Sequence, residues 1–568
     1  MFAVEGKVYT VRVHDASLER KTAENLLKLM LEVIETLKQK WGVVPIAFVT
    51  DASGESRKAR RLLQQLMPML ITPDCYAHQV NLIVGDYFKV DKGFLKYSKQ
   101  ATELITWLRS KTFVLALIRQ IQSENGSHPL AIIRAVLTRW TAHYLAYCRL
   151  LEVKMALKSL VLKDSMRPTN DKLLTTGDKK AKAKAKAMIK TIENPQFWSA
   201  IERMKKHLEP LAIAANIMQA AFCRLDEVLL TFGNLYRAFD CLTEPADRHV
   251  RKAVLSSIEL RWSKCDQDVF IAAWIFNMYL SLAWLKQLPF FTIQGIFTLL
   301  SRLHQRFFNS GPEVNVSLME DIQNYFNQRG RFHMLGAIKD TKQSPDPLAV
   351  YNMFAFPGQA TDDPPFIRLA KHILSVTANS ASCERLFSVF GNTLTKLRSR
   401  LSTTTLSNLA ELKMLVRDEH IRFGESQKRL KRKFGETTDE APVIQIAQPA
   451  TTQIPSVQSE DMEAEEEGID ASTGQEDGAF ASMATEMEQM LQQDEDLADL
   501  PTLPEGNISV KIVDLFDFTK DWGHSHIETA RQSLAEEGEL LELVDRGGVA
   551  EDGEDGLDPI TEAVLRGF

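Results

Sequence analysis

Glu384 is the acid with the most informative surroundings in this chain. It follows the small residues 378–382 and precedes the string "RLFSVF", whose apolar residues would form one face of a helix. A basic turn follows, and then a second stretch in which leucines recur at helical spacing. The apolar residues of interest in these stretches are Leu386, Phe387, Leu401, Leu406, Leu409 and Leu412. The pattern predicts two helices, the first of which carries a carboxylate at its start.

A second acid, Asp51, ends the apolar run 43–51, which is typical of a buried strand. An aspartate at the carboxyl end of a strand in an open α/β sheet often takes part in catalysis or binds metal. The ordinary alternative is that Asp51 caps the helix that follows or forms a turn. The residue alone does not separate these two interpretations.

Cys75 and His78 lie in the string "PDCYAHQVNLIV", at a spacing that could supply two zinc ligands. A structural zinc site needs four ligands, and no second pair follows at the spacing of a zinc finger. The zinc interpretation is therefore weak. The alternative is a buried cysteine followed by a histidine at the start of a helix.

Arg139 and Trp140 follow Thr138 in the string "LTRWTAHYL". A tryptophan beside an arginine near a helix end could stack on an unpaired base while the arginine meets a phosphate. Tryptophan is more often part of a protein core, so the pair is uninformative by itself.

The elements that must position these residues alternate between strand and helix at the start of the chain. Apolar alternation and short apolar runs predict strands, and a period near 3.6 predicts helices. The strands are expected at 7–14, 43–51 and 69–72, and the helices at 22–40, 56–66 and 78–88. Such alternation predicts an α/β sheet. From about residue 95 to 330 the pattern is almost wholly helical, and the lysine and alanine run 179–190 predicts an exposed or flexible basic helix without an apolar face.

The charge is divided unequally along the 568 residues, although the net charge is only −6. Residues 436–568 hold 34 acidic and 5 basic residues, which leaves 40 acidic and 63 basic residues in 1–435. A basic body is the electrostatic footprint expected for nucleic-acid binding, or else a set of dispersed surface charges. The acidic tail is expected to be mostly disordered. Its stretches 508–518 and 526–545 regain apolar periodicity, which indicates docking helices, an interaction segment or filler.

Several features bear on the compartment. The six cysteines are scattered and form no framework, which indicates a reducing, intracellular location. No basic region followed by an apolar run opens the chain, so no secretory signal is expected. The longest apolar stretch, 269–284, contains Asn277 and predicts a buried helix rather than a membrane span. The string "KRLKRK" at 428–433 is either a nuclear localisation patch or the exposed end of a helix.

Taken in order, these motifs resemble those of the hAT-superfamily transposases, of the fungal, transposon-derived type with a DUF659-like core region. The order is a strand aspartate, "CxxH", "TRW", a helical insertion with "NPQFW" and "FIAAWIFNMY", and a C-terminal dimerisation region. The resemblance covers about residues 5–420. It implies a fold of the α/β class, in which a ribonuclease H-like core is interrupted by a large all-α insertion.

The resemblance also implies roles for individual residues. Asp51 and Glu384 would be the second and third catalytic carboxylates, which in this family hold Mg²⁺. Residues of the DNA-handling apparatus would be Cys75, His78, Arg139 and Trp140. The six apolar residues named above, from Leu386 to Leu412, would serve dimerisation. The implied partners are a second copy of the chain and DNA, with neither a membrane nor a small-molecule substrate.

The family pattern is not complete in this sequence. The first catalytic aspartate of the family lies on a strand upstream of 7–14, and the sequence begins at Met1. We therefore expect an N-terminally truncated, incomplete core without its first strand and without transposase activity of its own. A nuclease that takes its first carboxylate from elsewhere in the chain is the enzymatic alternative.

The expected units follow from these assignments. They are the first part of the core (1–95), the helical insertion (96–340), a linker (341–365), the rest of the core with the dimerisation region (366–420), a basic segment (421–435) and the acidic tail (436–568). One interpretation is a transposon-derived protein that dimerises and binds DNA. The other is a domesticated nuclear regulator of transcription that recruits partners through its acidic tail.

Overall fold

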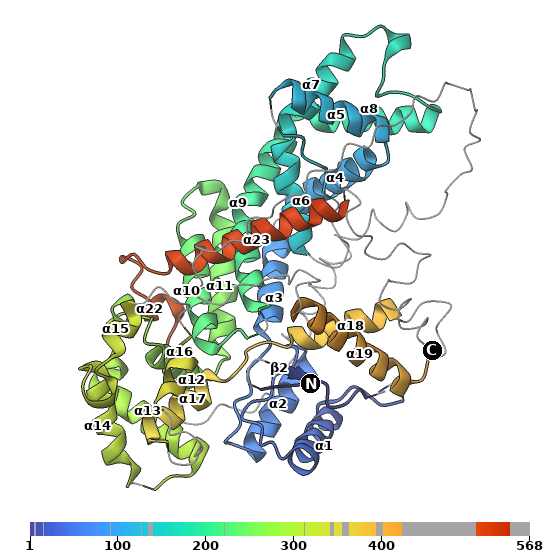
Figure 1. Cartoon of the computed structure of the whole chain (residues 1–568). Coiled ribbons are helices and arrows are strands. Elements are labelled where there is room, and N and C mark those ends of the chain that lie inside the picture. Colours follow the sequence, from blue (N-terminus) through green and yellow to red (C-terminus); the bar gives the residue numbers. More distant parts are fainter. Residues whose placement is uncertain are drawn as a thin grey trace.

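The computed structural model describes residues 1–4, 7–14, 16, 18–90, 92–126, 128–133, 140–220, 222–311, 313–340, 346–354, 363–393, 401–422 and 507–545. These residues form a predominantly helical molecule (Figure 1). Helices α1 and α2 lie at one end with the N-terminus, and α5, α7 and α8 lie at the opposite end.

The N-terminal unit consists of a short hairpin and two helices. Strands β1 (Phe2–Val4) and β2 (Lys7–Tyr9) pair antiparallel, with Phe2 opposite Tyr9. Helix α1 (Ala23–Trp41) begins at Thr22, whose hydroxyl accepts a hydrogen bond from the N–H of Asn25. It packs on α2 (Gly54–Leu66) through a small apolar cluster centred on Ile34 and Leu63. The predicted helices 22–40 and 56–66 are thus confirmed.

The expected α/β sheet is much reduced in the part of the chain that the structure describes. There, β1 and β2 are the only strands, and the stretches 43–51 and 69–72 contribute two isolated parallel bridges, Ala47 to Ile71 and Thr50 to Asp74. The run 43–51 contains Pro45, which has no N–H for a ladder. The strands predicted at 43–51 and 69–72 are therefore wrong, the strand predicted at 7–14 is present only as Lys7–Tyr9, and a ribonuclease H-like core stays a prediction.

The helical body begins with α3, which confirms the helix predicted at 78–88. Its helices are α3 (Tyr76–Val90), α4 (Lys92–Arg109), α5 (Thr112–Glu124), α6 (Trp140–Glu152), α7 (Lys154–Ser165), α8 (Lys179–Glu193), α9 (Pro195–Met218), α10 (Leu225–Asp240), α11 (Arg248–Ser263) and α12 (Gln267–Phe276). The short 3₁₀ helices between them are η1 (Thr169–Asp171) and η2 (Pro245–Asp247). One continuous core runs through the body, and α12 is buried along its whole length.

Further helices follow α12 in the sequence. They are η3 (Leu282–Trp284), η4 (Pro289–Phe291), α13 (Ile293–Phe308), α14 (Val314–Phe326), η5 (Gly330–Phe332), α15 (Leu335–Asp340), α16 (Pro347–Met353), α17 (Pro365–Leu374), α18 (Ala381–Thr393) and α19 (Thr403–Arg422). Helix α16 lies within the predicted linker 341–365 and buries Val350 and Tyr351.

Two expectations for charged segments can be compared with the structure. The lysine and alanine run does form a helix, α8, but this helix has an apolar face that buries Ala185, Met188 and Ile192. Within the acidic tail, α22 (Ile512–Leu515) and α23 (His524–Asp545) are folded onto the body (Figure 1). Disorder is predicted for most of the tail, with docking helices as one alternative for 508–518 and 526–545, and the structure bears out this alternative because the stretch carries enough apolar residues to be buried. The other residues of 436–568 and the string "KRLKRK" lie outside the described residues.

Candidate functional site

The start of α3 and the segment before α18 meet, although they are about 300 residues apart. The N–H of Tyr76 donates to the carbonyl of Ala378 at 3.0 Å, and the N–H of Ser380 donates to the sulfur of Cys75 at 3.3 Å. The N–H of Cys75 in turn donates to the carbonyl of Thr50, next to Asp51, at 3.0 Å. The structure therefore brings the segments that carry Asp51, Cys75 and Glu384 together.

Asp51 lies in the loop before α2 and is exposed. Its carboxylate accepts a hydrogen bond from the hydroxyl of Ser53 at 3.2 Å. Partial desolvation opposes its ionisation, but hydrogen bonds from Ser56 and Ser53 and the nearby His78 leave its pKa below the ordinary value. Asp51 is therefore an ionised carboxylate at neutral pH, as a metal ligand or a partner of a cation requires.

His78 lies one turn into α3 and is partly exposed. Burial lowers its pKa, the charge of Asp51 opposes that effect, and Arg261 and Arg57 add to it. The imidazole is therefore neutral at physiological pH. A neutral imidazole can accept a proton, donate a hydrogen bond or coordinate a metal.

Glu384 lies in the first turn of α18 and is exposed. An acid is favoured at this place because the first turn of a helix presents unpaired N–H groups. Burial raises the pKa of the Cys75 thiol, and the charge of Glu384 contributes to that rise. This interaction indicates that Glu384 faces the same region as Cys75.

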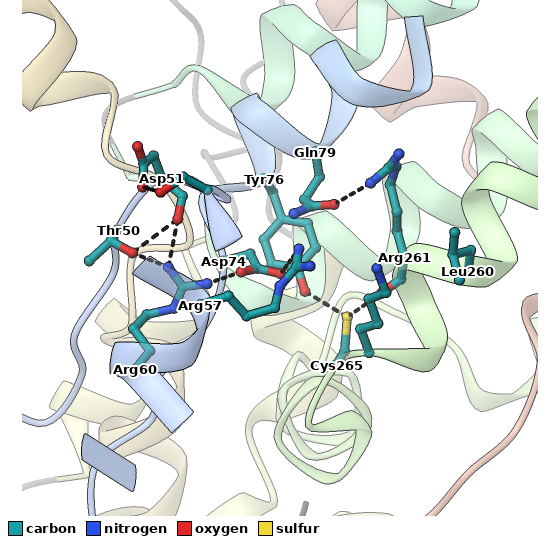
Figure 2. A network of polar contacts seen from close by, with 12 residues as sticks. Thr50, Asp51, Arg57, Arg60, Asp74, Tyr76, Gln79, Leu260, Arg261 and Cys265 are labelled. Atoms are coloured by element: carbon teal, nitrogen blue, oxygen red, sulfur yellow. Dashed lines mark hydrogen bonds and ion pairs between the residues drawn. The ribbon is translucent and has the colours of Figure 1, made fainter. Parts of the chain in front are cut away.

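A buried ion-pair network lies beneath Asp51 and was not anticipated from the sequence (Figure 2). Asp74 pairs with Arg57, whose Nη2 lies 3.3 Å from the carboxylate, and with Arg60. Arg60 is 2% exposed and donates to the backbone carbonyl of Asp51 at 2.7 Å. Burial, with the neighbouring Arg57, lowers the pKa of Arg60 to about 9. The signal that was missed is the spacing of arginines at 57, 60 and 61, which places them on one side of α2.

The network continues from α3 to α11. The hydroxyl of Tyr76 lies 2.8 Å from the sulfur of Cys265, and Arg261 donates to Gln79 at 3.2 Å (Figure 2). Arg261 also pairs with Asp86 at 3.1 Å. A pocket beside the network is lined by the basic side chains of Arg57, Arg60, Arg61 and Lys264 and by the acids Asp74 and Asp266.

Trp140 begins α6 and is 4% exposed. Its indole N–H donates to the side-chain oxygen of Asn81 on α3 at 2.9 Å. The ring is thus covered by protein in this conformation, and support of a base by Trp140 stays a prediction. Arg139 lies outside the described residues.

The residues expected to serve dimerisation fall into two groups. Leu386 and Leu406 pack between α18 and α19 with Phe390 and Ala410, and Leu401 is partly buried just before α19. The outward group consists of Phe387, Leu409 and Leu412, which are 63%, 39% and 43% exposed. Leu415, which was not among the predicted residues, lies one turn after Leu412 on α19, is 57% exposed and joins this group. The inner group joins the two helices, and the outer group is available for a partner.

The remaining expectations concern a metal site and a membrane-spanning helix. No cluster of three or more histidine, cysteine, aspartate or glutamate side chains with the geometry to hold a metal occurs among the described residues. Binding of Mg²⁺ by Asp51 and Glu384 stays a prediction. Among the same residues, none of the helices combines the length and the hydropathy needed to cross a membrane.

Comparison with known protein families gives one match. Residues 362–413 match the hAT family C-terminal dimerisation region, and the matched stretch spans α17, α18 and part of α19. This match supports membership of the hAT family and self-association of the chain. A search of curated proteins gave no match.

Proposed function

We propose that the chain is a hAT transposase-like protein that forms a homodimer through the outer face of α18 and α19. The observation that carries the proposal is the coincidence of the family match at 362–413 with the exposed group of Phe387, Leu409, Leu412 and Leu415. Apolar side chains that gather on one face of a soluble protein mark an interaction site. A two-fold axis would place the same face of each copy against the other.

The test of the dimer compares the full chain with a variant that carries Leu412→Glu and Leu415→Glu. Light scattering on a sizing column should give a dimer mass for the parent chain and a monomer mass for the variant at micromolar concentration. The matched control is Leu162→Glu on α7, where the side chain is 57% exposed but lies far from α19 in the sequence. A monomeric parent chain, or a variant that remains dimeric, would contradict the proposal.

DNA binding is the second part of the proposed function, and α8 is its best-supported contact. Six lysines of this helix are exposed: Lys179, Lys180, Lys182, Lys184, Lys186 and Lys190. Its buried face fixes the helix to the body, so these charges are presented on a rigid element. Lysines that neutralise phosphates release counterions, so binding must weaken as salt is raised.

The test of DNA binding measures the anisotropy of a labelled duplex over a range of salt concentrations. Replacing Lys182, Lys186 and Lys190 by Gln should weaken binding and reduce the salt slope by roughly one unit per lost phosphate contact. The control replaces the exposed Lys28, Lys99 and Lys252 by Gln. An unchanged slope in the α8 variant would remove α8 from the contact surface.

For the chemistry, we propose that Asp51 and Glu384 hold the positions of two family carboxylates without a complete metal site. The support is the joining of their segments through Cys75, together with the lack of a three-residue ligand group among the described residues. Supercoiled plasmid incubated with the protein and Mg²⁺ should stay intact. Nicking by the parent chain that Glu384→Gln abolishes would overturn this assignment and favour the nuclease alternative.

A further inference from the structure

The tail segment 507–522 lies in a groove formed by α10, α11, α12 and residues 282–286. In the sequence, 84 residues separate this segment from the end of α19 at Arg422. Three of its residues, Ile512, Leu515 and Phe516, are completely buried. The contacts come from side chains and backbone groups of the body, as they do when a protein recognises a peptide.

The side chains of the groove satisfy the backbone of the segment. The N–H of Ile508 donates to Asp268 at 2.8 Å, and the N–H of Val510 donates to Gln267 at 2.8 Å. With the segment in place, Gln267 and Asp268 are 3% and 1% exposed, and Asp268 also pairs with Arg302. The carboxylate of Glu259 accepts hydrogen bonds from the backbone N–H groups of Ile512 and Val513, at 2.9 and 3.0 Å, where α22 begins.

Backbone pairing fixes the second half of the segment. The N–H of Lys286 donates to the carbonyl of Leu515, and the N–H of Asp517 donates to the carbonyl of Trp284, both at 2.9 Å. These bonds form an antiparallel bridge between Leu285 and Phe516. Addition of an extended segment to backbone groups of a folded domain is a common mode of peptide recognition.

A glycine in the floor of the groove makes room for Phe516. Gly233 lies in the middle of α10, and a Cβ atom there would lie 2.8 to 2.9 Å from the Phe516 ring, which is too close for contact. Glycine is the least favourable helix residue after proline, so its presence inside α10 requires a reason. The reason that the structure offers is the ring of the tail.

An aromatic cluster completes the site. The Phe516 ring stacks on Trp522 with centroids 4.9 Å apart and meets Trp274 edge-on at 5.4 Å. Trp522 also stacks on Trp284 at 6.4 Å, and Arg237 lies 5.7 Å from the Trp522 centroid. Large aromatic side chains in desolvated pockets are the usual anchors of binding energy at interfaces.

We propose that this groove is a peptide-recognition site and that residues 507–522 of the same chain are its ligand. The proposal requires that the segment can leave without unfolding the helices that form the groove. The site would recognise a peptide segment whose first backbone N–H groups donate to side chains of the groove and which carries two aromatic anchors, Phe516 and Trp522. The proposal is independent of the dimer face on α18 and α19.

The experiment starts from the full chain with a site for a specific protease placed between residues 423 and 506. After cleavage, the C-terminal fragment should co-elute with the body on a sizing column. Gly233→Ala should release the fragment, with at least about tenfold weaker binding, because the added methyl group occupies the place of Phe516. The body of this variant should keep its circular dichroism and its cooperative unfolding. The matched control is Gly391→Ala in α18, where a Cβ atom meets nothing within 4 Å.

A second variant tests the site from the side of the ligand. Phe516→Ala should release the fragment to a similar extent, whereas Lys511→Ala, at an exposed position, should not. Loss of the fragment from the parent chain after cleavage would overturn the proposal, as would tight retention by the Gly233→Ala chain. Unfolding of the body on release would show that 507–522 is an integral part of the fold, which would also overturn it.

Discussion

The sulfur of Cys75 accepts a hydrogen bond from the backbone N–H of Ser380 at 3.3 Å, across 305 residues of sequence. Cys75 is completely buried, so its thiol acts as a small packing group and a weak acceptor. This contact places the segment that carries Glu384 against the loop of Asp51. The contact of a cysteine at the start of α3 with the approach to α18 thus links the two motifs in the fold.

Replacement of Cys75 by Ala should loosen this junction. The change leaves the amide of Ser380 without its acceptor and a small cavity beneath it, which should cost about 1–2 kcal/mol of unfolding free energy. Hydrogen exchange at Ser380 should accelerate, and urea unfolding should shift to lower denaturant concentration. Cys241→Ala, at an exposed cysteine, is the control and should change neither measurement. Unchanged exchange at Ser380 would show that the sulfur does not hold the segment.

Much of this site could be predicted from the sequence because its motifs are local. Asp51 ends the apolar run 43–51, which the structure leaves partly exposed, and Cys75 and His78 lie one turn apart at the start of α3, so their types and spacing are visible in the sequence. The ion-pair network could not be predicted, because Asp74 meets Arg57 and Arg60 only after two bridges align 47–50 with 71–74. Charges on a predicted helix do not reveal which of them will be buried.

Asp74→Asn tests whether this network supports the fold. Arg57 and Arg60 are both about 2% exposed, and removal of the carboxylate leaves their charges buried without it. Breaking a buried ion pair in this way costs about 3–5 kcal/mol. The thermal midpoint should therefore fall by several degrees. Glu24→Gln, which breaks an exposed pair with Lys58, should leave the midpoint unchanged. A similar midpoint for both variants would mean that the network contributes no more than a surface pair.

The fold itself was predictable where periodicity is strong and the segment is long. Helices α1, α2 and α3 begin and end within a few residues of their predicted bounds, because apolar spacing and caps mark them. The strands predicted at 43–51 and 69–72 are wrong because short apolar runs do not specify a partner, and tertiary packing left only isolated bridges there, whereas part of 7–14 does pair as β2. Residues 507–545 dock in a groove that is assembled from helices distant in the sequence. The apolar periodicity of this stretch could therefore indicate that it docks, but not where.

Trp140→Phe separates a packing role from a nucleic-acid role. The substitution keeps an aromatic ring but removes the indole N–H that donates to Asn81. We expect a loss of about 1 kcal/mol in unfolding free energy and no change in the affinity for single-stranded DNA. Chemical denaturation and anisotropy with a labelled oligonucleotide would measure the two quantities. A tenfold loss of affinity with unchanged stability would instead place a base on this ring.

Docking of the tail should depend on pH through His526. This side chain lies in α23, is 6% exposed and approaches the hydroxyl of Thr231 on α10, with Nε2 at 3.3 Å. Burial lowers its pKa from 6.5 to about 4, while Asp226 raises it and Arg224 lowers it further. The released tail should titrate near the ordinary value of about 6.5. Docking is therefore fully stable above pH 6.5, weakens as the pH falls, and should lose about 2 kcal/mol at pH 5.

The measurement follows release of the tail, because other buried histidines with lowered pKa values, such as His143 and His304, also weaken the body in acid. Protease digestion of the tail at several pH values above the acid unfolding of the body reports release directly. His526→Gln should remove most of the pH dependence between 6.5 and 5, since no proton can then be taken up at this position. His333→Gln, at an exposed histidine, should leave the profile of the parent chain intact. Equal pH profiles for the parent chain and His526→Gln would show that another group controls docking.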